Sequence, residues 1–287
     1  MTLSSSVPAS HRKPSALGRN LFIYGLYAFI FVQVLFPLSW AFFGAFKSPS
    51  EIFAYPPSFW PRNATLENFQ NILTRGSFAR AVWNTVIVSA VSVVLTLALG
   101  SMAAYAISRW NFRFKDTFLV VLLGLQLIPS TVNIVPYYLM MNELGLLNTL
   151  TGLVVIYTAS NIPITIWLLK GFFDTIPVSL DEAAAIDGCS KFRTFFSIVL
   201  PLSLPGMSVA GFLAFISCWS EFLVPLVIAP SRDTTVVSVG LYNFFGPDGV
   251  EYNALFAATL ITVAPVIVAY LFAQRYIVSG LTAFSEK

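Results

Sequence analysis

The chain has 287 residues, of which 57% are hydrophobic and 10% are charged, and its mean hydropathy is +0.78. This composition excludes a water-soluble protein and is typical of an integral membrane protein. The sequence has no Gly-Lys dipeptide, which excludes a phosphate-binding loop of the G-x-x-x-x-G-K-[ST] type. With a single histidine and no Cys/His or paired-carboxylate cluster in the apolar runs, it presents no visible metal site or catalytic constellation.

Uncharged runs long enough to cross a membrane recur along the chain. A helix needs about 20 apolar residues to cross about 30 Å of hydrocarbon. Six runs reach this length: 21–46, 81–108, 117–142, 144–169, 194–220 and 252–274. We therefore predict an all-α integral membrane protein with six transmembrane helices. The fourth helix is expected to start near Leu150 and the fifth near Leu204.

The first 20 residues carry Ser, Pro and basic side chains and include His11, so we expect a disordered tail. A signal peptide is the alternative interpretation of this tail together with the run that follows. The run 21–46 is too long for a signal-peptide core and lacks a small-x-small exit. We interpret it as the first transmembrane helix.

Lysine and arginine are unevenly divided between the two sides of this topology. The side with both termini holds eleven of them and the other side holds five. This bias predicts that both termini and the polar loop 179–201 are cytoplasmic. The same bias accounts for the net charge of +3 without a nucleic-acid partner. Cys189 and Cys218 fall at different levels, so we expect no disulfide between them.

The outer segment 47–80 is rich in proline, asparagine and aromatic residues. Its stretch TLENF (65–69) is expected to cap a short helix lying on the membrane surface. Trp83, near the start of the second transmembrane helix, fits an interfacial aromatic anchor. That helix ends in AAYA (103–106) and Arg109, and the small residues suit close helix contact.

Polar residues in the third and fourth helices are candidates for a translocation pathway. In lipid such residues are tolerated only when they face protein or a water-filled path. The candidates are Gln126, Asn133 and Asn161. The alternative is that they form hydrogen bonds between helices and have no role in transport.

The fifth helix carries two further pathway candidates, Trp219 and Glu221. Glu221 is the one acidic residue within a predicted span, so it should face the interior of the bundle or lie near the outer boundary. Trp219 projects to a different helix face, and Pro225 frees a backbone carbonyl that a polar interior can satisfy. A structural salt bridge or hydrogen bond is the alternative role for Glu221.

The loop SLDEAAAIDGCSKFRTFFSIVLP (179–201) reads as two short helices. Ser179 is expected to be the N-cap of the first helix, with Glu182 completing a capping box and Pro177 stopping the preceding helix. Gly188 provides the break, because glycine accepts the left-handed conformation at little cost. Helices this short are marginal alone and need a surface to pack on.

Each of these two short helices has one distinctive face. Four residues give the first helix a face that another protein could approach closely: Leu180, Ala183, Ala184 and Asp187. Four residues at i, i+3, i+4 and i+7 predict a single apolar face on the second helix: Phe192, Phe195, Phe196 and Val199.

The order Glu-Ala-Ala (182–184), Gly188 and Ile-x-Leu-Pro (198–201) resembles the EAA loop of ABC importer permeases. In that family the loop is a cytoplasmic coupling helix that docks into a cleft of the ATPase subunit. The resemblance implies that six residues contact the ATPase: Asp181, Glu182, Ala183, Ala184, Asp187 and Gly188. An interfacial segment without a partner is the alternative.

Shorter motifs indicate one branch of this family. Asn-Phe (68–69), Trp-Asn-Thr (83–85) and Gly-Leu-Thr-Ala (280–283) resemble the carbohydrate branch, specifically the smaller permease subunit of maltose-type systems. Ser220 departs from the family pattern, since it replaces the asparagine of Trp-Asn-Glu-Phe. The resemblance covers roughly 66–283.

The resemblance implies a permease subunit that forms half of the pathway for an oligosaccharide or polyol-like solute. It implies a cofactor-free chain in the bacterial or archaeal inner membrane, with ATP hydrolysed by a separate subunit. The implied partners are a second homologous permease, two ATP-binding cassette subunits and an extracytoplasmic solute-binding protein.

The predicted divisions are a cytoplasmic tail (1–20), the first helix and outer loop (21–79), the permease core (80–276) and a cytoplasmic tail (277–287). Three alternatives remain. A permease for a peptide, amino acid or anion would share the loop. A secondary transporter would show repeated halves and coupling carboxylates. An integral-membrane enzyme lacks its catalytic residues.

Overall fold

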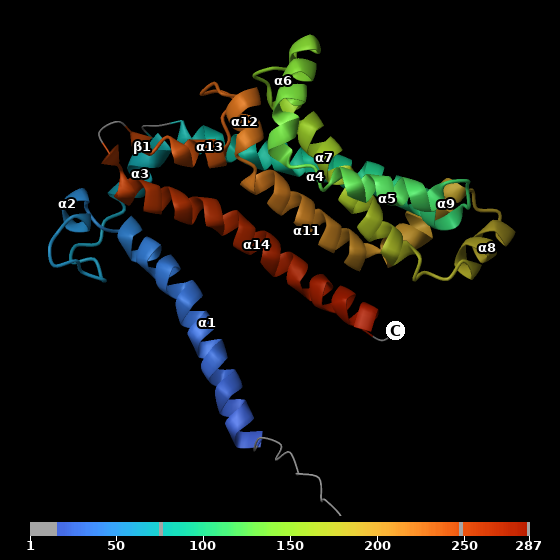
Figure 1. Cartoon of the computed structure of the whole chain (residues 1–287), viewed down its shortest axis with the longest axis horizontal. Helices are drawn as coiled ribbons and strands as arrows, with labels where there is room; N and C mark the ends of the chain where they lie inside the picture. The colour runs from blue at the N-terminus through green and yellow to red at the C-terminus, as the bar shows by residue number, and fades with distance from the viewer. Residues whose placement is uncertain (1–15, 75–76, 247–248, 286–287) are drawn as a thin grey trace, which may run out of the picture.

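The computed structural model describes residues 16–74, 77–246 and 249–285, and these residues form a mostly helical protein (Figure 1). Among them, four helices are long and apolar enough to cross a membrane: α1 (Ala16–Ala45), α4 (Phe78–Arg109), α7 (Leu150–Phe173) and α14 (Tyr252–Ser285). Two bent helix pairs bring the number of candidate spans to six. The predicted all-α membrane fold is confirmed.

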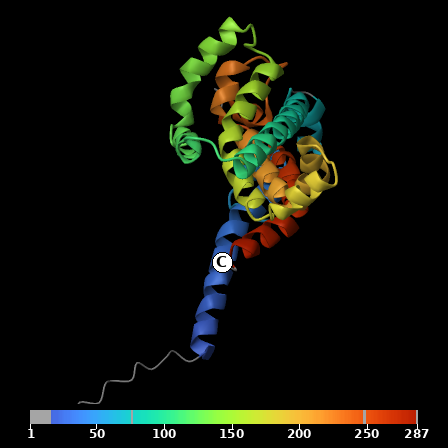
Figure 2. The same cartoon turned by 90° about the vertical axis from the view of Figure 1, so that its right-hand side faces the viewer.

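The two bent spans break near prolines, because proline has no backbone N–H with which to continue a preceding helix. The first pair joins α5 (Lys115–Leu125) to η1 (Ser130–Asn133) and α6 (Ile134–Glu143), with a bend of 88° at the break 126–129, which ends in Pro129. It forms an arch beside the other helices (Figure 2). The second pair bends by 79° before α11 (Leu204–Ser220), which has Pro205 in its first turn.

Several helix boundaries agree with the sequence-based expectations and two differ. α7 starts at Leu150 and α11 at Leu204, as predicted. α1 begins at Ala16 inside the expected tail, while residues 1–15, including His11, lie outside the described residues. α14 continues to Ser285, into the segment expected to be a tail. Neither helix has a proline near the residue where the sequence analysis expected it to begin or end. Each helix can therefore continue past that residue.

The core is built around the pair α4 and α7, which pack against each other along most of their length. Gly100 makes this approach feasible, since a Cβ atom there would lie 2.6 Å from Cγ2 of Thr165. Ala104 is fully buried in the same contact region, together with Ile166 and Leu169, which confirms the close packing predicted from the small residues.

The short elements lie at two opposite ends of the helical body (Figure 1). One end, here called the α3 end, holds these elements: α2 (Pro49–Ile52), α3 (Glu67–Thr74), α13 (Val237–Tyr242), and the antiparallel strands β1 (Phe245–Gly246) and β2 (Gly249–Val250). The other end, the α8 end, holds α8 (Ser179–Ile186) and α9 (Lys191–Thr194). α3 is the short helix predicted from TLENF, and the N–H of Glu67 donates to Oγ1 of Thr65 (3.1 Å).

Two asparagines of the sequence motifs hold the α3 end together. Nδ2 of Asn84 donates to the carbonyls of Asp233 (2.8 Å) and Thr235 (2.9 Å), which fixes the chain before α13 onto the start of α4. Asn68 fixes the end of α1 in the same way, donating to the carbonyls of Ala45 and Lys47 (both 2.8 Å). These motif positions therefore have a structural explanation.

Candidate functional site

At the α8 end, the break predicted at Gly188 is confirmed. Gly188 has φ +80°, and the N–H of Cys189 donates to the carbonyl of Ala184 (2.9 Å) while that of Gly188 donates to Ala185 (3.1 Å). These two hydrogen bonds form a Schellman motif, which satisfies the last carbonyls of α8. The chain can then turn directly into α9 (Lys191–Thr194).

The predicted capping box at Ser179 is wrong. Val178 is the N-cap residue and makes no side-chain capping bond, and Ser179 is already the first helical residue. Val178 has nearly helical torsion angles, φ −63° and ψ −25°, so its carbonyl accepts from the N–H of Glu182 (3.1 Å). A cap is found instead before the second helix, where Oγ of Ser190 accepts from the N–H of Arg193 (3.3 Å).

Asp181 anchors α8 to the body of the protein. Its carboxylate accepts a hydrogen bond from Nε of Arg109 (2.9 Å), the last residue of α4, and another from the Tyr105 hydroxyl. Arg109 also donates to the carbonyls of Phe173 and Ile176 (both 3.1 Å), just where α7 ends. One guanidinium therefore joins α4, α7 and α8.

The predicted faces of the two short helices need correction. Ala184 is buried inside the chain with Asp181 beside it, so it is not part of an exposed face. The other three residues of the predicted face, Leu180, Ala183 and Asp187, are exposed as expected, and Glu182 and Ile186 are exposed with them. Ile186 has an apolar side chain and is 87% exposed.

The phenylalanines after Gly188 divide between two faces and do not form one. Phe195 and Val199 are buried, whereas Phe192 and Phe196 are exposed. The cause is the π-helical segment η2 (Phe195–Val199), because an i→i+5 turn breaks the 3.6-residue period on which the prediction relied. Phe195 packs against Tyr105 with ring centroids 5.0 Å apart, so the second helix is also fastened to α4.

A cavity of about 340 Å³, here called the interior cavity, lies between the α5–α6 arch, α7 and α11. Three predicted pathway residues line it: Gln126, Asn161 and Glu221. The sequence-based reasoning missed other polar lining residues, including Tyr137, Tyr157 and Ser160. Their spacing alone gave no signal, because hydroxyl side chains are common in buried helix contacts.

Among the described residues that line this cavity, one buried polar atom has no hydrogen-bond partner. Gln126 donates through Nε2 to the carbonyl of Ser160 (3.0 Å), and Asn161 donates to that of Tyr157 (2.8 Å). The Tyr157 hydroxyl is buried and has no hydrogen-bond partner among the described residues. The wall of the cavity therefore holds a buried hydroxyl that can both donate and accept a hydrogen bond.

Glu221 lies at a break in the fifth span, between α11 and α12 (Leu223–Ile228). Its carboxylate accepts from the N–H groups of Leu223 (3.0 Å) and Val224 (3.2 Å), which satisfies the start of α12. Pro225 leaves the carbonyl of Glu221 free, and the Ser238 hydroxyl donates to it at 2.6 Å. The freed carbonyl was predicted from the sequence, and its partner was not.

The remaining two pathway candidates lie outside the interior cavity. Trp219 is buried on the other side of α11, where Nε1 donates to the carbonyl of Thr262 in α14 (3.1 Å). This confirms that Trp219 and Glu221 project to different faces. Asn133 ends η1 and is not part of the cavity lining.

The described residues contain no group of three or more His, Cys, Asp and Glu side chains that could hold a metal ion. Cys189 and Cys218 are both free thiols. The interior cavity offers hydrogen-bonding groups, and the exposed side of α8 offers a contact surface.

Comparisons with known proteins agree with this architecture. The chain is 33% identical over 282 residues to the diacetylchitobiose uptake system permease protein NgcG of Streptomyces coelicolor, covering 98% of this chain and 91% of that protein. It is 32% identical over 279 residues to the trehalose/maltose transport system permease protein MalG of Thermococcus litoralis, covering 96% and 99%. The expected resemblance to a maltose-type permease is confirmed.

A crystal structure of a bacterial ABC transporter involved in import of the acidic polysaccharide alginate contains a chain of the same fold. The TM-score is 0.80 at 21% identity, with 94% of this chain and 100% of that chain covered. A family model described as "Binding-protein-dependent transport system inner membrane component" matches residues 96–283. The chain belongs to this family of membrane-embedded ABC importer permeases, which are transport components and not enzymes.

Proposed function

We propose that this permease imports an oligosaccharide as half of a two-permease pathway. Separate ATPase subunits drive the transport, and an extracytoplasmic solute-binding protein delivers the solute. Two relatives that match more than nine tenths of the chain are named for uptake of diacetylchitobiose and of trehalose and maltose. Dependence on a binding protein is part of the family description.

The division of α8 into an anchored side and an exposed side carries the coupling part of the proposal. Asp181 holds α8 to Arg109, whereas Ile186 has an apolar side chain that is almost fully exposed. Glu182, Ala183, Asp187 and Gly188 are exposed around it. An apolar side chain surrounded by small and acidic residues suits a protein partner, since burying it would remove apolar area from water.

We place the α8 end and both termini in the cytoplasm. The support is the division of lysine and arginine, with eleven on the side of the termini and five on the other. The α3 end then faces the outside, where a binding protein would dock. The interior cavity lies between the two ends and is the proposed route of the solute, with Gln126, Asn161 and Glu221 in its wall.

The test compares two substitutions at the α8 end. Ile186→Glu places a charge on the exposed side of α8 and should weaken association with the ATPase by about tenfold or more, since the charge would be buried unpaired. Phe112→Glu is the matched control, because Phe112 is also exposed at this end but lies outside α8. Co-purification of the ATPase and solute-stimulated ATP hydrolysis are the measurements. Equal behaviour of the two variants would reject the proposed coupling surface.

A further inference from the structure

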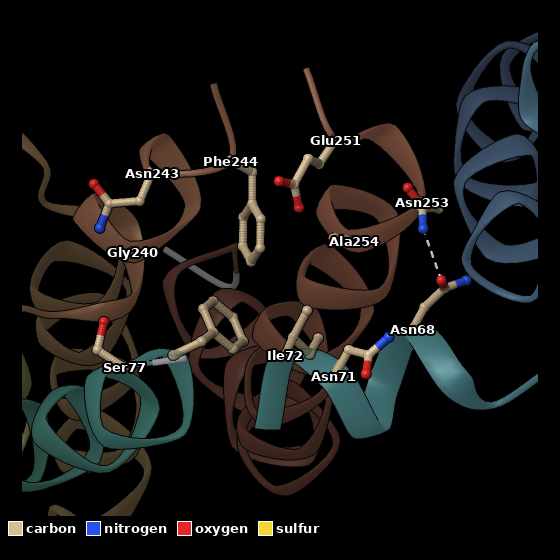
Figure 3. Close-up of a pocket in the computed structure, with 11 residues that line it drawn as sticks. Asn68, Asn71, Ile72, Ser77, Gly240, Asn243, Phe244, Glu251, Asn253 and Ala254 are labelled. Atoms are coloured by element: carbon tan, nitrogen blue, oxygen red, sulfur yellow. Dashed lines mark hydrogen bonds between the residues drawn. The ribbon is translucent and has the colours of Figure 1, made fainter. Parts of the chain in front are cut away.

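A second cavity lies at the α3 end, where α3, the start of α4, α13 and the start of α14 meet (Figure 3). We call it the asparagine pocket. Its volume is about 400 Å³, and its lining shares no residue with that of the interior cavity. Six described lining residues have polar side chains: Asn68, Asn71, Ser77, Asn243, Glu251 and Asn253.

Part of this polar lining is already used by the fold. Asn68 donates to two backbone carbonyls, and its Oδ1 accepts from Nδ2 of Asn253 at 2.8 Å. By contrast, the side chains of Asn71, Asn243 and Glu251 make no hydrogen bond to any described residue. Their amide and carboxylate groups are therefore free to bind a ligand.

Apolar side chains form the rest of the wall. Phe78 is buried and Phe244 is half-buried, and their ring centroids lie 5.7 Å apart with a tilt of 58°. Figure 3 shows Asn243 and Ser77 on one side of the Phe244 ring and Asn71 on the other. A ligand in the pocket would thus meet aromatic surface in the middle and amides on both sides.

This combination suits a carbohydrate. A sugar hydroxyl both donates and accepts, and a primary amide offers an acceptor oxygen and two donor hydrogens to match it. The C–H face of a sugar ring is apolar and can be removed from water against the phenyl rings. A volume of about 400 Å³ falls within the 300–1,000 Å³ of small-molecule sites, in which a few polar groups are set in an apolar wall.

The charge of the pocket lining indicates which class of sugar it would bind. Among the described residues that line it, Glu251 is the one charged side chain. A carboxylate accepts hydrogen bonds from hydroxyls or from an ammonium group, but it repels an anionic ligand. The lining thus favours a neutral or amino sugar over a uronic acid.

We propose that the asparagine pocket is a binding site for a neutral carbohydrate, separate from the interior cavity. The inference rests on the proposed function, since a sugar importer supplies the ligand and places this pocket on the outer side. Solute that leaves the binding protein would meet the pocket before it enters the pathway.

The experiment uses the assembled transporter in lipid nanodiscs, without the binding protein. Diacetylchitobiose and maltose are the neutral probes, glucuronate is the anionic probe, and equilibrium binding is measured by saturation-transfer NMR. Asn71→Leu and Asn243→Leu remove one free amide each from different elements, and each should raise the Kd for a neutral sugar by about three- to tenfold. Asn142→Leu is the matched control, because Asn142 is exposed at the end of α6 and does not line the pocket. Glu251→Gln should lower the ratio of the Kd for glucuronate to the Kd for diacetylchitobiose, because it removes the charge that repels the anion.

Kd values for both leucine variants equal to that of Asn142→Leu would overturn the proposal. So would unchanged sugar binding combined with loss of binding-protein docking when the binding protein is added to the same variants in a separate assay, which would show that the pocket receives a protein segment. Sugar uptake by the wild-type transporter tests the proposed function separately. If the wild-type transporter takes up sugar and the leucine variants bind sugar as well as wild type, the binding site in the pocket is rejected and the transport function stands. If the wild-type transporter takes up no sugar, the proposed transport function is rejected.

Discussion

Nε of Arg109 lies 2.9 Å from Oδ2 of Asp181, although the two residues are 72 positions apart in the chain. Their side chains are 7% and 16% exposed, so little water screens the pair. Because Arg109 also binds the carbonyls of Phe173 and Ile176, its guanidinium joins α8 to the ends of α4 and α7, and α8 cannot leave its position without breaking the pair with Asp181.

Replacing Asp181 by alanine should therefore destabilise the α8 end. Removing one partner of a buried ion pair costs about 3–5 kcal/mol, and the lower value applies here because Arg109 keeps its two carbonyl partners. We expect a lower melting temperature of the purified transporter and less transport per ATP hydrolysed. Thermal unfolding and coupled uptake assays measure the two effects.

The ion pair of Lys170 and Asp174 provides the control for this substitution. It lies at the same end of the protein but is more exposed, at 26% and 40% of the two side chains. Asp174→Ala should cost about 1 kcal/mol or less. If it destabilises the protein as much as Asp181→Ala does, burial of the Arg109 pair is not the cause.

Gly188→Val should uncouple ATP hydrolysis from transport. No atom lies within 4 Å of the position of an added Cβ, so the cost is the left-handed conformation at φ +80°, about 1 kcal/mol or more for a β-branched residue. Gly145→Val is matched in both respects, with φ +65° and open space, but lies between α6 and α7. Solute-stimulated ATPase activity should fall in the first variant only. Equal loss in both variants would assign the effect to general strain.

Residues around the interior cavity should be reachable from water in at least one state of the transport cycle. In a background without Cys189 and Cys218, a water-soluble thiol reagent should label Ser160→Cys and Glu221→Cys, which line the cavity. Ala214→Cys, buried in α11 away from the lining, should stay unlabelled. Absence of labelling at both cavity positions, with and without ATP, would show that the cavity is closed to water throughout.

Glu221→Gln should leave the transporter assembled but alter transport. Glutamine keeps a side-chain oxygen that can accept from the N–H groups of Leu223 and Val224, so the start of α12 remains satisfied. The change removes the negative charge from the cavity wall. Uptake and basal ATPase activity measure the effect, and values equal to wild type would contradict a role in the pathway.

Reporter fusions can test the proposed orientation. Fusions at Ser231 and Gly145 should report an extracytoplasmic location, because both residues lie on the side with five basic residues. A fusion at Ser190, between α8 and α9, should report the cytoplasm. A cytoplasmic signal from Ser231 would reverse the assignment.

The outer loop should lose stability in acid through Glu51. The backbone N–H of Arg62 donates to the carboxylate of Glu51 at 2.7 Å, and this hydrogen bond lowers the pKa of Glu51. A carboxylate whose pKa is lowered by folding stabilises the folded state at pH values above its pKa in the unfolded chain. This stabilisation is lost as the pH falls through its pKa in the folded state. Glu51→Gln should therefore flatten the acid side of a plot of melting temperature against pH. An identical plot for wild type and variant would exclude this role.

The predictions that succeeded depend on local sequence. Run length alone located the four long apolar helices and the two bent pairs that make up the six candidate spans, since crossing hydrocarbon sets a minimum number of apolar residues. Gly188 was predicted because few residues other than glycine adopt its φ readily. Gln126, Asn161 and Glu221 were chosen because polar groups in lipid must turn inward, and all three line the interior cavity, while their role in transport stays a prediction.

The features that were missed depend on contacts between distant segments. Arg109 was noticed as a helix end, but its pairing with Asp181 requires knowing how α4 lies against α8. Ser179 satisfied every local rule for a cap, yet the turn before it already places Val178 in a helical conformation. The π-helical turn at Phe195 likewise has no local signal, since the phenylalanine spacing fits an α-helix.

α4 is fastened at both of its ends, by Asn84 to the chain before α13 and by Arg109 to α8. At 1.5 Å per residue the two attachment points are about 38 Å apart along a single continuous helix. If α4 tilted as a rigid body by about 5° about its middle, each attachment point would move by about 1.6 Å, and the two would move in opposite directions. The asparagine pocket borders the first turn of α4, so a rigid tilt of this helix would change the shape of the pocket and the position of α8 together.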